Sequence, residues 1–406
     1  MQQHPATIRP LIRPDLVRAT ALCWIAVAAV ATAISVAQHL QHGLTNTAGE
    51  PLGADFINTW TGAALAWRGQ AQTVYDWLAY HAFQEQIVGA PLDFYHYSYP
   101  PVLLLLAPLG ALPYLVALGV WTLCGWLAFY FALRSAFPHR ALLFALAAPA
   151  VLVNTLGGQN GTWSAALLAG GLWLLPRRPV VAGILFGLLI YKPQLGLLLP
   201  IALLAGREGR AFGAAAATAI VLVLASGLLF GFELWPSYLR NAETLRGTIL
   251  EDGTGVWHRM VSVFVFARRI GFDVSSAYAM QLIVAVPVAI GVAIAWWRNW
   301  PADLRNALTV VGTCLVTPYL QDYDLVMAVF AAAALLAAMT PHTQMLAVAG
   351  AGLLLVAPLL AAPVGLATGL SIGAVMLAPV FPIIWMMKRR ADTITPFTSA
   401  SIQQQS

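Results

Sequence analysis

The sequence predicts an all-α polytopic membrane protein with one large membrane domain. Of its 406 residues, 60% are hydrophobic and only 9% are charged. Soluble globular proteins average nearer ~45–50% apolar and ~25% charged residues, so a chain this poor in charge must place most of its surface in lipid. Apolar runs alternate with short polar segments along most of the chain. From these runs we expect about twelve membrane helices.

The charged residues indicate membrane topology rather than a nucleic-acid partner. The net charge is +5, but the arginines cluster at the ends of apolar runs, where positive charge fixes which end stays in the cytoplasm. Cys23, Cys124 and Cys314 all lie inside apolar runs and lack the spacing of a metal site. We interpret them as small hydrophobic side chains of helices.

The N-terminal segment 1–18 is predicted to lie in the cytoplasm, because it carries arginines just before the apolar run 19–37. That run is too long for a signal peptide and is interpreted as the first membrane helix. We expect residues 39–100 to form the first periplasmic loop. Within it, residues 60–88 mix aromatic and polar side chains without a run of spanning length, which favours helices that lie in the interface plane.

The later apolar runs alternate in direction, so that both termini face the cytoplasm. After a long run that reaches Leu133, they cover residues 141–156, 162–175, 180–190, 195–205, 211–230, 277–297, 307–316, 325–339, 346–360 and 366–387. The membrane domain thus spans 19–390, and the polar tail 391–406 is expected to be disordered. Several runs are too short for about 30 Å of hydrocarbon, and such helices occur where they line a cavity. We therefore expect a cavity that opens on the outer side.

The stretch GADFINTW at 53–60 holds the candidate general base, Asp55. This acid follows the first membrane helix and lies beside apolar residues, which can make a carboxylate a competent base toward a sugar hydroxyl. Ionisable groups near membrane depth are costly and usually functional. Asp55 could instead cap the helix that follows it, because aspartate is common at helix N-termini.

Two further segments at predicted outer ends contain candidate binding residues. Lys192, in the segment YKPQ, could bind a lipid-linked phosphate or snorkel to lipid headgroups, and Gln194 could share its site. The segment GGQNG at 157–161 could bring the amides of Gln159 and Asn160 close to a ligand, or it could be a plain loop.

The remaining candidates are aromatic or lie in later loops. Tyr97 and Tyr99 are interpreted first as an interfacial aromatic belt, although aromatic rings also stack on sugars. His258 could contact phosphate or sugar, but a lone loop histidine usually does neither. Asp322 and Asp324, in the segment QDYD, face the cavity mouth only if the next helix begins there. The aspartates of this segment could equally cap that helix.

Together these segments resemble glycosyltransferase family 87, the membrane enzymes related to polyprenol-phosphate-mannose-dependent mannosyltransferases. No single segment is specific, but their order and spacing over residues 53–325 are. The resemblance rests on ADF at 54–56, YSYPP at 97–101 with Pro108 and Pro113 after it, GGQNG at 157–161, YKPQ at 191–194 and TPY at 317–319.

The resemblance implies a GT-C-class fold and an inverting transfer of a hexose, with mannose as the expected sugar. The donor would be a polyprenyl-phosphate sugar and the acceptor a lipid or glycan. By this analogy Asp55 accepts the proton, Lys192 and His258 steady the phosphate, and Gln159 and Asn160 hold sugar hydroxyls. The expected substrate-binding set is Lys192, Gln159, Asn160, Tyr97, Tyr99, Gln194, His258, Gln321 and Asp322.

The resemblance also implies a multi-pass protein of the bacterial inner membrane with its active site in the periplasm. Its expected partners are the two substrates and membrane lipids, without nucleic acid. We expect no metal and no other cofactor. The spacing of Asp322 and Asp324 is the DxD of nucleotide-sugar enzymes, which use it to hold a metal, but no soluble nucleotide-binding domain surrounds it.

One segment departs from the family pattern. Mannosyltransferases of the family carry histidine after the Thr-Pro pair, whereas this chain continues as YLQDYD, so the acceptor and the sugar stay open. A transporter or flippase of lipid-linked saccharides would share the cavity, the aromatic residues and the lysine. Such proteins often contain internal repeats, and the two halves of this sequence show none. A structural membrane subunit would not need polar residues gathered on one side.

Overall fold

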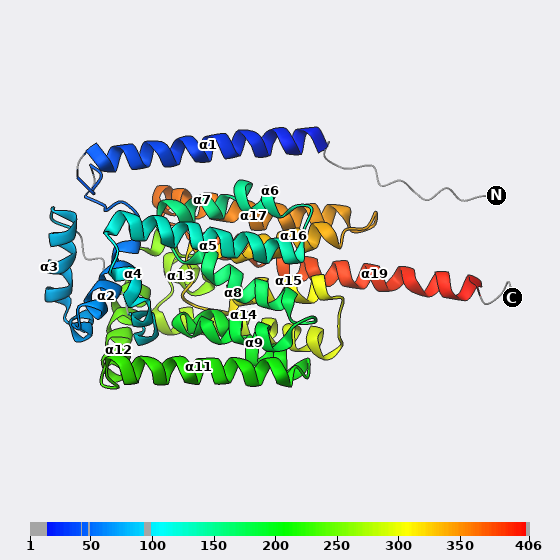
Figure 1. Cartoon of the computed structure of the whole chain (residues 1–406). Helices are drawn as coiled ribbons and strands as arrows, with labels where there is room; N and C mark the ends of the chain where they lie inside the picture. The colour runs from blue at the N-terminus through cyan, green and yellow to red at the C-terminus, as the bar shows by residue number, and fades with distance from the viewer. Residues whose placement is uncertain (1–13, 42, 48, 93–98, 403–406) are drawn as a thin grey trace.

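The computed structural model describes residues 14–41, 43–47, 49–92 and 99–402 (Figure 1). Within these ranges every regular element is helical, and only two isolated β-bridges occur. The long helices run side by side along one axis, and the start of α1 and the end of α19 point to the same end of the bundle (Figure 1). The all-α prediction is confirmed.

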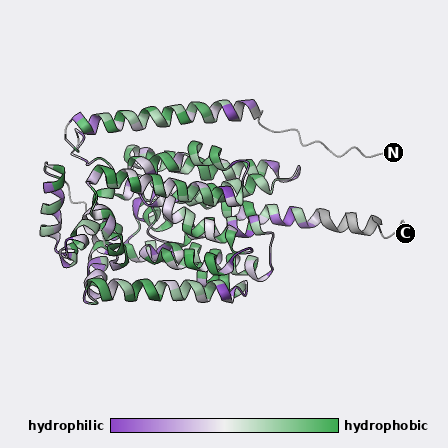
Figure 2. Ribbon diagram, in the orientation of Figure 1, coloured by the Kyte–Doolittle hydropathy of each residue, from purple (hydrophilic) through white to green (hydrophobic). Residues whose placement is uncertain are grey.

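Five of the described helices are long and apolar enough to cross a membrane. They are α1 (Pro14–Gln41), α5 (Tyr114–Ala136), α11 (Gly209–Phe230), α14 (Val274–Trp297) and α17 (Gln344–Thr368). Hydrophobic residues dominate the long helices (Figure 2), and many large apolar side chains of α1, α11 and α14 are exposed. An apolar surface of this extent suits lipid rather than water. The chain is therefore a polytopic membrane protein, and the total of about twelve membrane helices stays a prediction.

The remaining helices of the bundle are shorter. They are α6 (Ala141–Ala147), α7 (Pro149–Leu156), α8 (Gly161–Leu174), α9 (Pro179–Leu188), α10 (Leu199–Ala205), α15 (Ala302–Val316), α16 (Ala328–Ala337), α18 (Gly373–Leu377) and α19 (Val380–Ile402). Proline suits a first helical turn because the amide hydrogen that it lacks would be unpaired there, and it begins α7 and α9. One- and two-turn helices join some of them, namely η3 (Leu189–Tyr191), η4 (Pro193–Gly196) and η7 (Asp322–Met327).

The centre of the bundle is formed by α15 and α16, which are buried along most of their lengths. They pack against each other, and α14 and α17 cover them. The segment QDYD lies between these two helices, and its aspartates are almost completely buried. The polar residues of this segment are therefore held inside the protein rather than in a surface loop.

The end of the bundle away from the start of α1 is covered by short elements (Figure 1). They are α2 (Phe56–Trp67), η1 (Ala71–Tyr75), α3 (Trp77–Val88), η2 (Pro101–Leu106), α4 (Ala107–Gly110), α12 (Leu234–Leu245), the π-helix η5 (Arg246–Glu251), η6 (Trp257–Arg259) and α13 (Val263–Arg269). In Figure 1, α3 runs across the direction of the long helices, as an interfacial helix would.

In contrast, α2 is a core helix, although we expected the segment that contains it to lie in the interface plane. Eleven of its twelve residues are buried. Small residues allow this packing: a Cβ atom at Gly62 would lie 2.4 Å from the ring of Tyr99, and one at Gly110 of α4 would lie 2.3 Å from the backbone of Ala63. The close approach of α4 and Tyr99 leaves α2 no free face.

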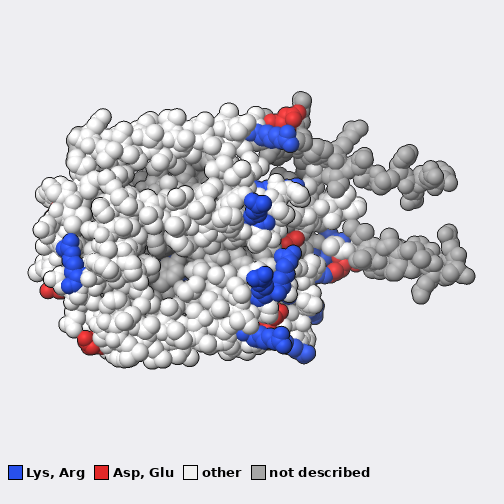
Figure 3. Space-filling model, viewed as in Figure 1, with Lys and Arg blue, Asp and Glu red and all other residues white. Residues whose placement is uncertain are grey.

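The C-terminal helix and the surface charges lie at the opposite end. Helix α19 continues to Ile402, through most of the segment that we expected to be a disordered tail, and Lys388 donates to Asp392 one turn further on. On the face seen in Figure 3, lysine and arginine side chains gather at the end of the bundle where α1 begins, and few lie at the other end.

Candidate functional site

Asp55 lies at the end of a tight turn that leads into α2. Gly53 has a φ of 81° and Ala54 a φ of 37°, left-handed values that are strained for a residue with a Cβ atom. The Asp55 side chain does not cap α2. It accepts a hydrogen bond from Nε2 of Gln159 instead. The turn therefore directs the carboxylate toward the GGQNG segment rather than back over its own helix.

The GGQNG turn packs directly against two other segments. A Cβ atom at Gly158 would lie 2.4 Å from the carbonyl oxygen of Gly53, and one at Gly161 would lie 2.1 Å from that of Tyr323. Gly158 also has a left-handed φ of 56°. Only glycine allows backbones to approach this closely. The two glycines thus bring the Asp55 turn, the GGQNG turn and the QDYD segment together.

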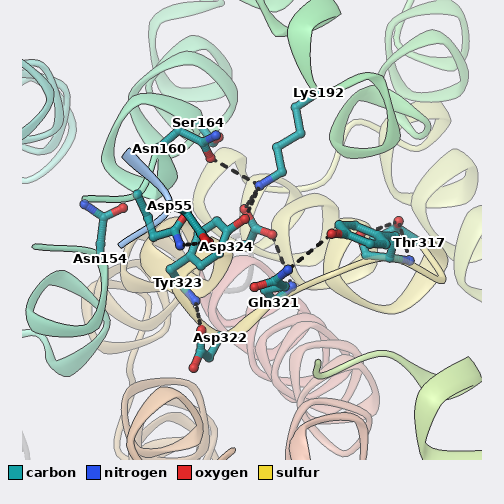
Figure 4. A network of polar contacts seen from close by, with 12 residues as sticks. Asp55, Asn154, Asn160, Ser164, Lys192, Thr317, Gln321, Asp322, Tyr323 and Asp324 are labelled. Carbon is teal, nitrogen blue, oxygen red and sulfur yellow. Dashed lines mark hydrogen bonds and ion pairs between the residues drawn. The ribbon is translucent and has the colours of Figure 1, made fainter. Parts of the chain in front are cut away.

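Lys192 lies between η3 and η4, where the break in the helix turns its side chain into the protein (Figure 4). The residue is 6% exposed. Its Nζ atom donates to Oδ1 of Asp324 at 2.5 Å, to Oδ1 of Asn160 at 3.2 Å and to the hydroxyl of Tyr323 at 3.4 Å. An ammonium group has three hydrogens, and these contacts use all of them. Lys192 is therefore fixed inside the site and does not snorkel to headgroups.

The two aspartates of the QDYD segment bind different cations and point in different directions (Figure 4). Asp322 accepts from Arg259, whose Nε atom lies 3.2 Å from both oxygens and whose Nη2 atom lies 3.0 Å from Oδ1. Asp324 binds Lys192 through Oδ1, and its Oδ2 atom accepts from the backbone amide of Gln321 at 3.2 Å. Asp324 thus caps its helix and pairs with a lysine at once.

The pairing of Arg259 with Asp322 changes the pKa values of two neighbouring residues of η6, Arg259 and His258. Burial lowers the pKa of Arg259, but the negative charges of Asp322 and, more weakly, Asp55 outweigh it and raise the pKa above its usual value. Arg259 is therefore charged at every physiological pH. Burial and the charge of Arg259 lower the pKa of His258 below its ordinary value of 6.5, so this imidazole is neutral at pH 7.

One cavity of about 370 Å³ contains most of these groups. Five of the residues expected from the sequence line it, namely Asp55, Asn160, Lys192, Gln194 and Gln321. Its other lining residues are Pro100, Leu103, Tyr191, Pro193, Tyr238, Ala242, Leu245, Arg246, Ile249, Leu250, Pro318, Tyr319 and Tyr323. Asp55 and Lys192 share one cavity, as we expected. A groove between α9, α10 and α11 is larger but has only apolar lining, so it offers no comparable chemistry.

Other candidates from the sequence lie outside the cavity lining. Tyr99 is 1% exposed, and its hydroxyl donates to the carbonyl oxygen of Thr59 at 3.1 Å. It therefore packs against α2 rather than on the cavity wall. His258 lies beside the Arg259 pair rather than on the cavity wall, and Asp322 is buried in that pair. Tyr97 lies outside the described residues.

Several residues of the site were not predicted from the sequence. Arg246 lines the cavity from η5, and Arg259 anchors Asp322. Both arginines lie in the predicted outer loop between α11 and α14, where the positive-inside rule expects few of them. An arginine on the outer side is therefore a signal that could have identified them. Asp324 was expected either to face the cavity mouth or to cap the next helix, and its ion pair with Lys192 was not predicted.

The fold and the cavity define a helical membrane protein with a polar site enclosed by helix ends. The family model described as glycosyltransferase family 87 matches residues 95–318, which is more than half of the chain. The chain belongs to this family and is therefore a glycosyltransferase. No curated protein and no solved structure matches it. The QDYD segment begins three residues after the matched range, whereas Asp55 lies 40 residues before it. The contacts described above join both to polar motifs inside the range.

Proposed function

We propose that the protein transfers a hexose from a polyprenyl-phosphate donor to a lipid or glycan acceptor by a single inverting displacement. The observation that supports this most directly is the shared cavity of Asp55 and Lys192. A base and a cation that face one cavity suit a reaction in which a hydroxyl loses a proton while a phosphate leaves. Mannose is the sugar that the family resemblance favours.

In this proposal Asp55 is the general base. The acceptor hydroxyl gives its proton to the Asp55 carboxylate while its oxygen forms the bond to the anomeric carbon. The bond from that carbon to the phosphate oxygen breaks, and the lipid phosphate leaves with the electron pair. Gln159 donates to one carboxylate oxygen and so fixes the orientation of the base. A second catalytic carboxylate is not needed because phosphate is a good leaving group.

The phosphate would bind between Lys192 and Arg246. Lys192 has its hydrogens engaged, and the weakest of its contacts, 3.4 Å to Tyr323, is the one that a phosphate oxygen would replace. Arg246 lines the same cavity, with a largely exposed side chain that lies 3.5 Å from Glu251. Leu103, Ile249 and their apolar neighbours would contact the first part of the prenyl chain. The amides of Asn160, Gln194 and Gln321 are the donors and acceptors for sugar hydroxyls.

The charge distribution supports a periplasmic active site. Basic side chains gather at the end of the bundle where α1 begins (Figure 3), and positive charge favours the cytoplasmic side of a membrane. The cavity is built from elements at the other end. We therefore propose a protein of the bacterial inner membrane whose site takes its substrates from the outer leaflet.

The test compares wild-type protein with Asp55→Asn after purification and reconstitution into nanodiscs. Labelled polyprenyl-phosphate hexoses are supplied with lipid and glycan acceptors, and the transferred sugar is measured. Asn keeps the size and the partner of Asp55, so the variant should fold and lose transfer at least about 10²-fold. The matched control is Asp273→Asn, which changes an exposed helix cap that asparagine also fills well.

Transfer by Asp55→Asn at nearly the wild-type rate would refute the role of this residue. If the protein moved the donor across a bilayer without transferring its sugar, it would act as a transporter or flippase, and the proposed reaction would be wrong.

A further inference from the structure

Three cations lie in or beside the cavity, and each has a carboxylate partner among the described residues. The pairs are Lys192–Asp324, Arg259–Asp322 and Arg246–Glu251. In the first two pairs the nitrogen and oxygen atoms lie 2.5 and 3.0 Å apart, and the carboxylates are almost completely buried. The third pair is longer, at 3.5 Å, and its side chains are 56% and 20% exposed. A phosphate that enters the cavity therefore separates Arg246 from its partner more easily than it separates either of the other pairs.

Glu251 is the fixed member of this exposed pair. Its Oε1 atom accepts a hydrogen bond from the hydroxyl of Tyr278 on α14 at 2.8 Å. Its carbonyl oxygen accepts from Nε of Arg268 on α13 at 3.2 Å and from Nη2 of the same residue at 2.9 Å. Two helices thus hold the side chain and the backbone of Glu251. More than half of the Arg246 side chain is exposed, so Arg246 is the member that can turn toward a ligand.

The π-helical turn η5 brings Arg246 and Glu251 together. The two residues are five positions apart, and residues at that spacing lie on different faces of an α-helix. In a π-helix each amide donates to the carbonyl five residues earlier, as Asp252 does to Gly247 at 2.8 Å. Residues five apart then lie one above the other. Turns of this kind are rare and occur frequently at functional sites.

The proposed transfer changes the charge of the phosphate. The donor is a phosphodiester, which has a single ionisable oxygen. When the bond to the anomeric carbon breaks, the phosphate keeps the electron pair and leaves as a monoester, which carries about −1.5 to −2 charges at pH 7. Repulsion from a fixed carboxylate grows with the charge of the approaching group. Glu251 therefore opposes the product at Arg246 more strongly than it opposes the donor.

We propose that Glu251 sets the preference of the cavity for the phosphodiester donor over the phosphomonoester product. It competes with the phosphate for Arg246 and so promotes release of the lipid phosphate after transfer. The proposal rests on the proposed transferase function for the identity of the two ligands. Because the pair is exposed, the competition changes affinity by at most about fivefold. Glu251 contacts none of the reacting atoms in this role, and it determines specificity without being catalytic.

The test measures binding of the two forms of phosphate without a sugar, so that it does not depend on transfer. Full-length protein in detergent is titrated with farnesyl phosphate and with its methyl diester, and calorimetry gives each Kd. The wild type should bind the two ligands with affinities that differ by no more than about threefold. Glu251→Gln keeps the size of the side chain and an acceptor for Tyr278. This variant should shift the ratio of the two affinities about two- to fivefold toward the monoester.

Two variants control for charge and for structure. Glu243→Gln removes the same charge from an exposed position of α12, three residues before Arg246, and should leave both affinities unchanged. Glu251→Asp keeps the negative charge on η5 and should keep the ratio of the two affinities closer to that of the wild type. Together they distinguish the pairing of Glu251 with Arg246 from a general effect of charge at this end of the molecule.

The outcomes separate the two proposals. An unchanged ratio in Glu251→Gln, or the same shift in Glu243→Gln, would overturn the role of Glu251 while leaving Asp55-dependent transfer intact. A wild type that binds the monoester more than about threefold tighter than the diester would also overturn it, even if Glu251→Gln failed to fold. Discrimination without any sugar transfer would instead contradict the proposed reaction. Where both hold, Glu251→Gln should lower the inhibition constant of farnesyl phosphate about two- to fivefold and change the donor KM much less.

Discussion

Removing one partner of the buried Lys192–Asp324 pair should destabilise the protein far more than removing both. The Nζ and Oδ1 atoms lie 2.5 Å apart, and the side chains are 7% and 0% exposed. At an effective dielectric constant of about 20, unit charges at this distance attract by about 7 kcal/mol. Desolvation of the two buried ions costs several kcal/mol each, so the terms nearly cancel in the intact pair. A lone charge keeps its desolvation cost without the attraction.

We therefore expect Asp324→Asn to lower the free energy of unfolding by about 3–5 kcal/mol, even though asparagine still accepts from the Gln321 amide. Lys192→Met should cost a similar amount. The double variant should cost no more than about 2 kcal/mol, because neither charge remains. Unfolding of the purified protein in detergent micelles measures all three, and the double-mutant cycle gives the coupling energy between the two residues.

The matched control is Lys388→Met, which removes the same atoms from an exposed pair with Asp392 on α19. Surface pairs of this kind contribute at most about 1 kcal/mol. If the double variant lost as much free energy of unfolding as the two single variants together, a lone buried charge would not explain their instability. The rate of sugar transfer by the double variant then distinguishes two roles of Lys192. If this variant is stable but inactive, the result supports a contact between the pair and the substrate. If it transfers sugar at the wild-type rate, Lys192 has only a structural role.

Three further substitutions test other parts of the site. Gly158→Ala should cost about 1–3 kcal/mol of stability and reduce transfer, because its Cβ atom would meet backbone at 2.4 Å, whereas the control Gly119→Ala has nothing within 4 Å and should unfold like the wild type. Arg259→Lys keeps the charge but cannot form the bidentate contact with Asp322, so the thermal midpoint and kcat should both fall; unchanged values would show that charge alone suffices. The lowered pKa of His258 means that the unfolded chain binds more protons below about pH 6.5, so stability should fall from pH 7 to pH 5. His258→Gln should lessen that fall, and thermal midpoints across this range would contradict the idea if the two curves were parallel.

The cavity could be predicted from the sequence because it depends on topology. Asp55, Asn160 and Lys192 each follow or precede an apolar run at its predicted outer end. The alternation of arginines assigns all three to one side, and short interrupted helices imply a cavity between them. These inferences need only the order of the runs and not their packing.

The pairing of charges inside the site could not be predicted in the same way. Lys192 and Asp324 are 132 residues apart, and Arg259 and Asp322 are 63 apart. Which cation meets which carboxylate is decided by how η3, η6 and η7 pack, and no local pattern encodes that choice. The sequence could therefore suggest a phosphate or lipid headgroups as partners of Lys192, but not the carboxylate of Asp324.

The burial of α2 could not be predicted from its own sequence either. Its residues mix aromatic and small apolar side chains, which is also the composition of an interfacial helix. The contacts of Gly62 with Tyr99 and of Gly110 with Ala63 decide the outcome, and both depend on segments that come later in the chain. Composition alone could not separate a helix on the surface from one enclosed by its neighbours.

The contact of the GGQNG turn with both the Asp55 turn and the QDYD segment has a consequence for the order of biosynthesis. Asp55 leaves the ribosome early, but its site also needs Lys192 and Asp324. At about 5–20 residues per second, the roughly 270 residues between Asp55 and Asp324 take on the order of 10–60 s to synthesise. During that interval Asp55 lacks the partners that complete its site. If the proposed mechanism holds, a chain truncated before the QDYD segment would lack a complete site, and transfer would begin only after α15 and this segment have been added.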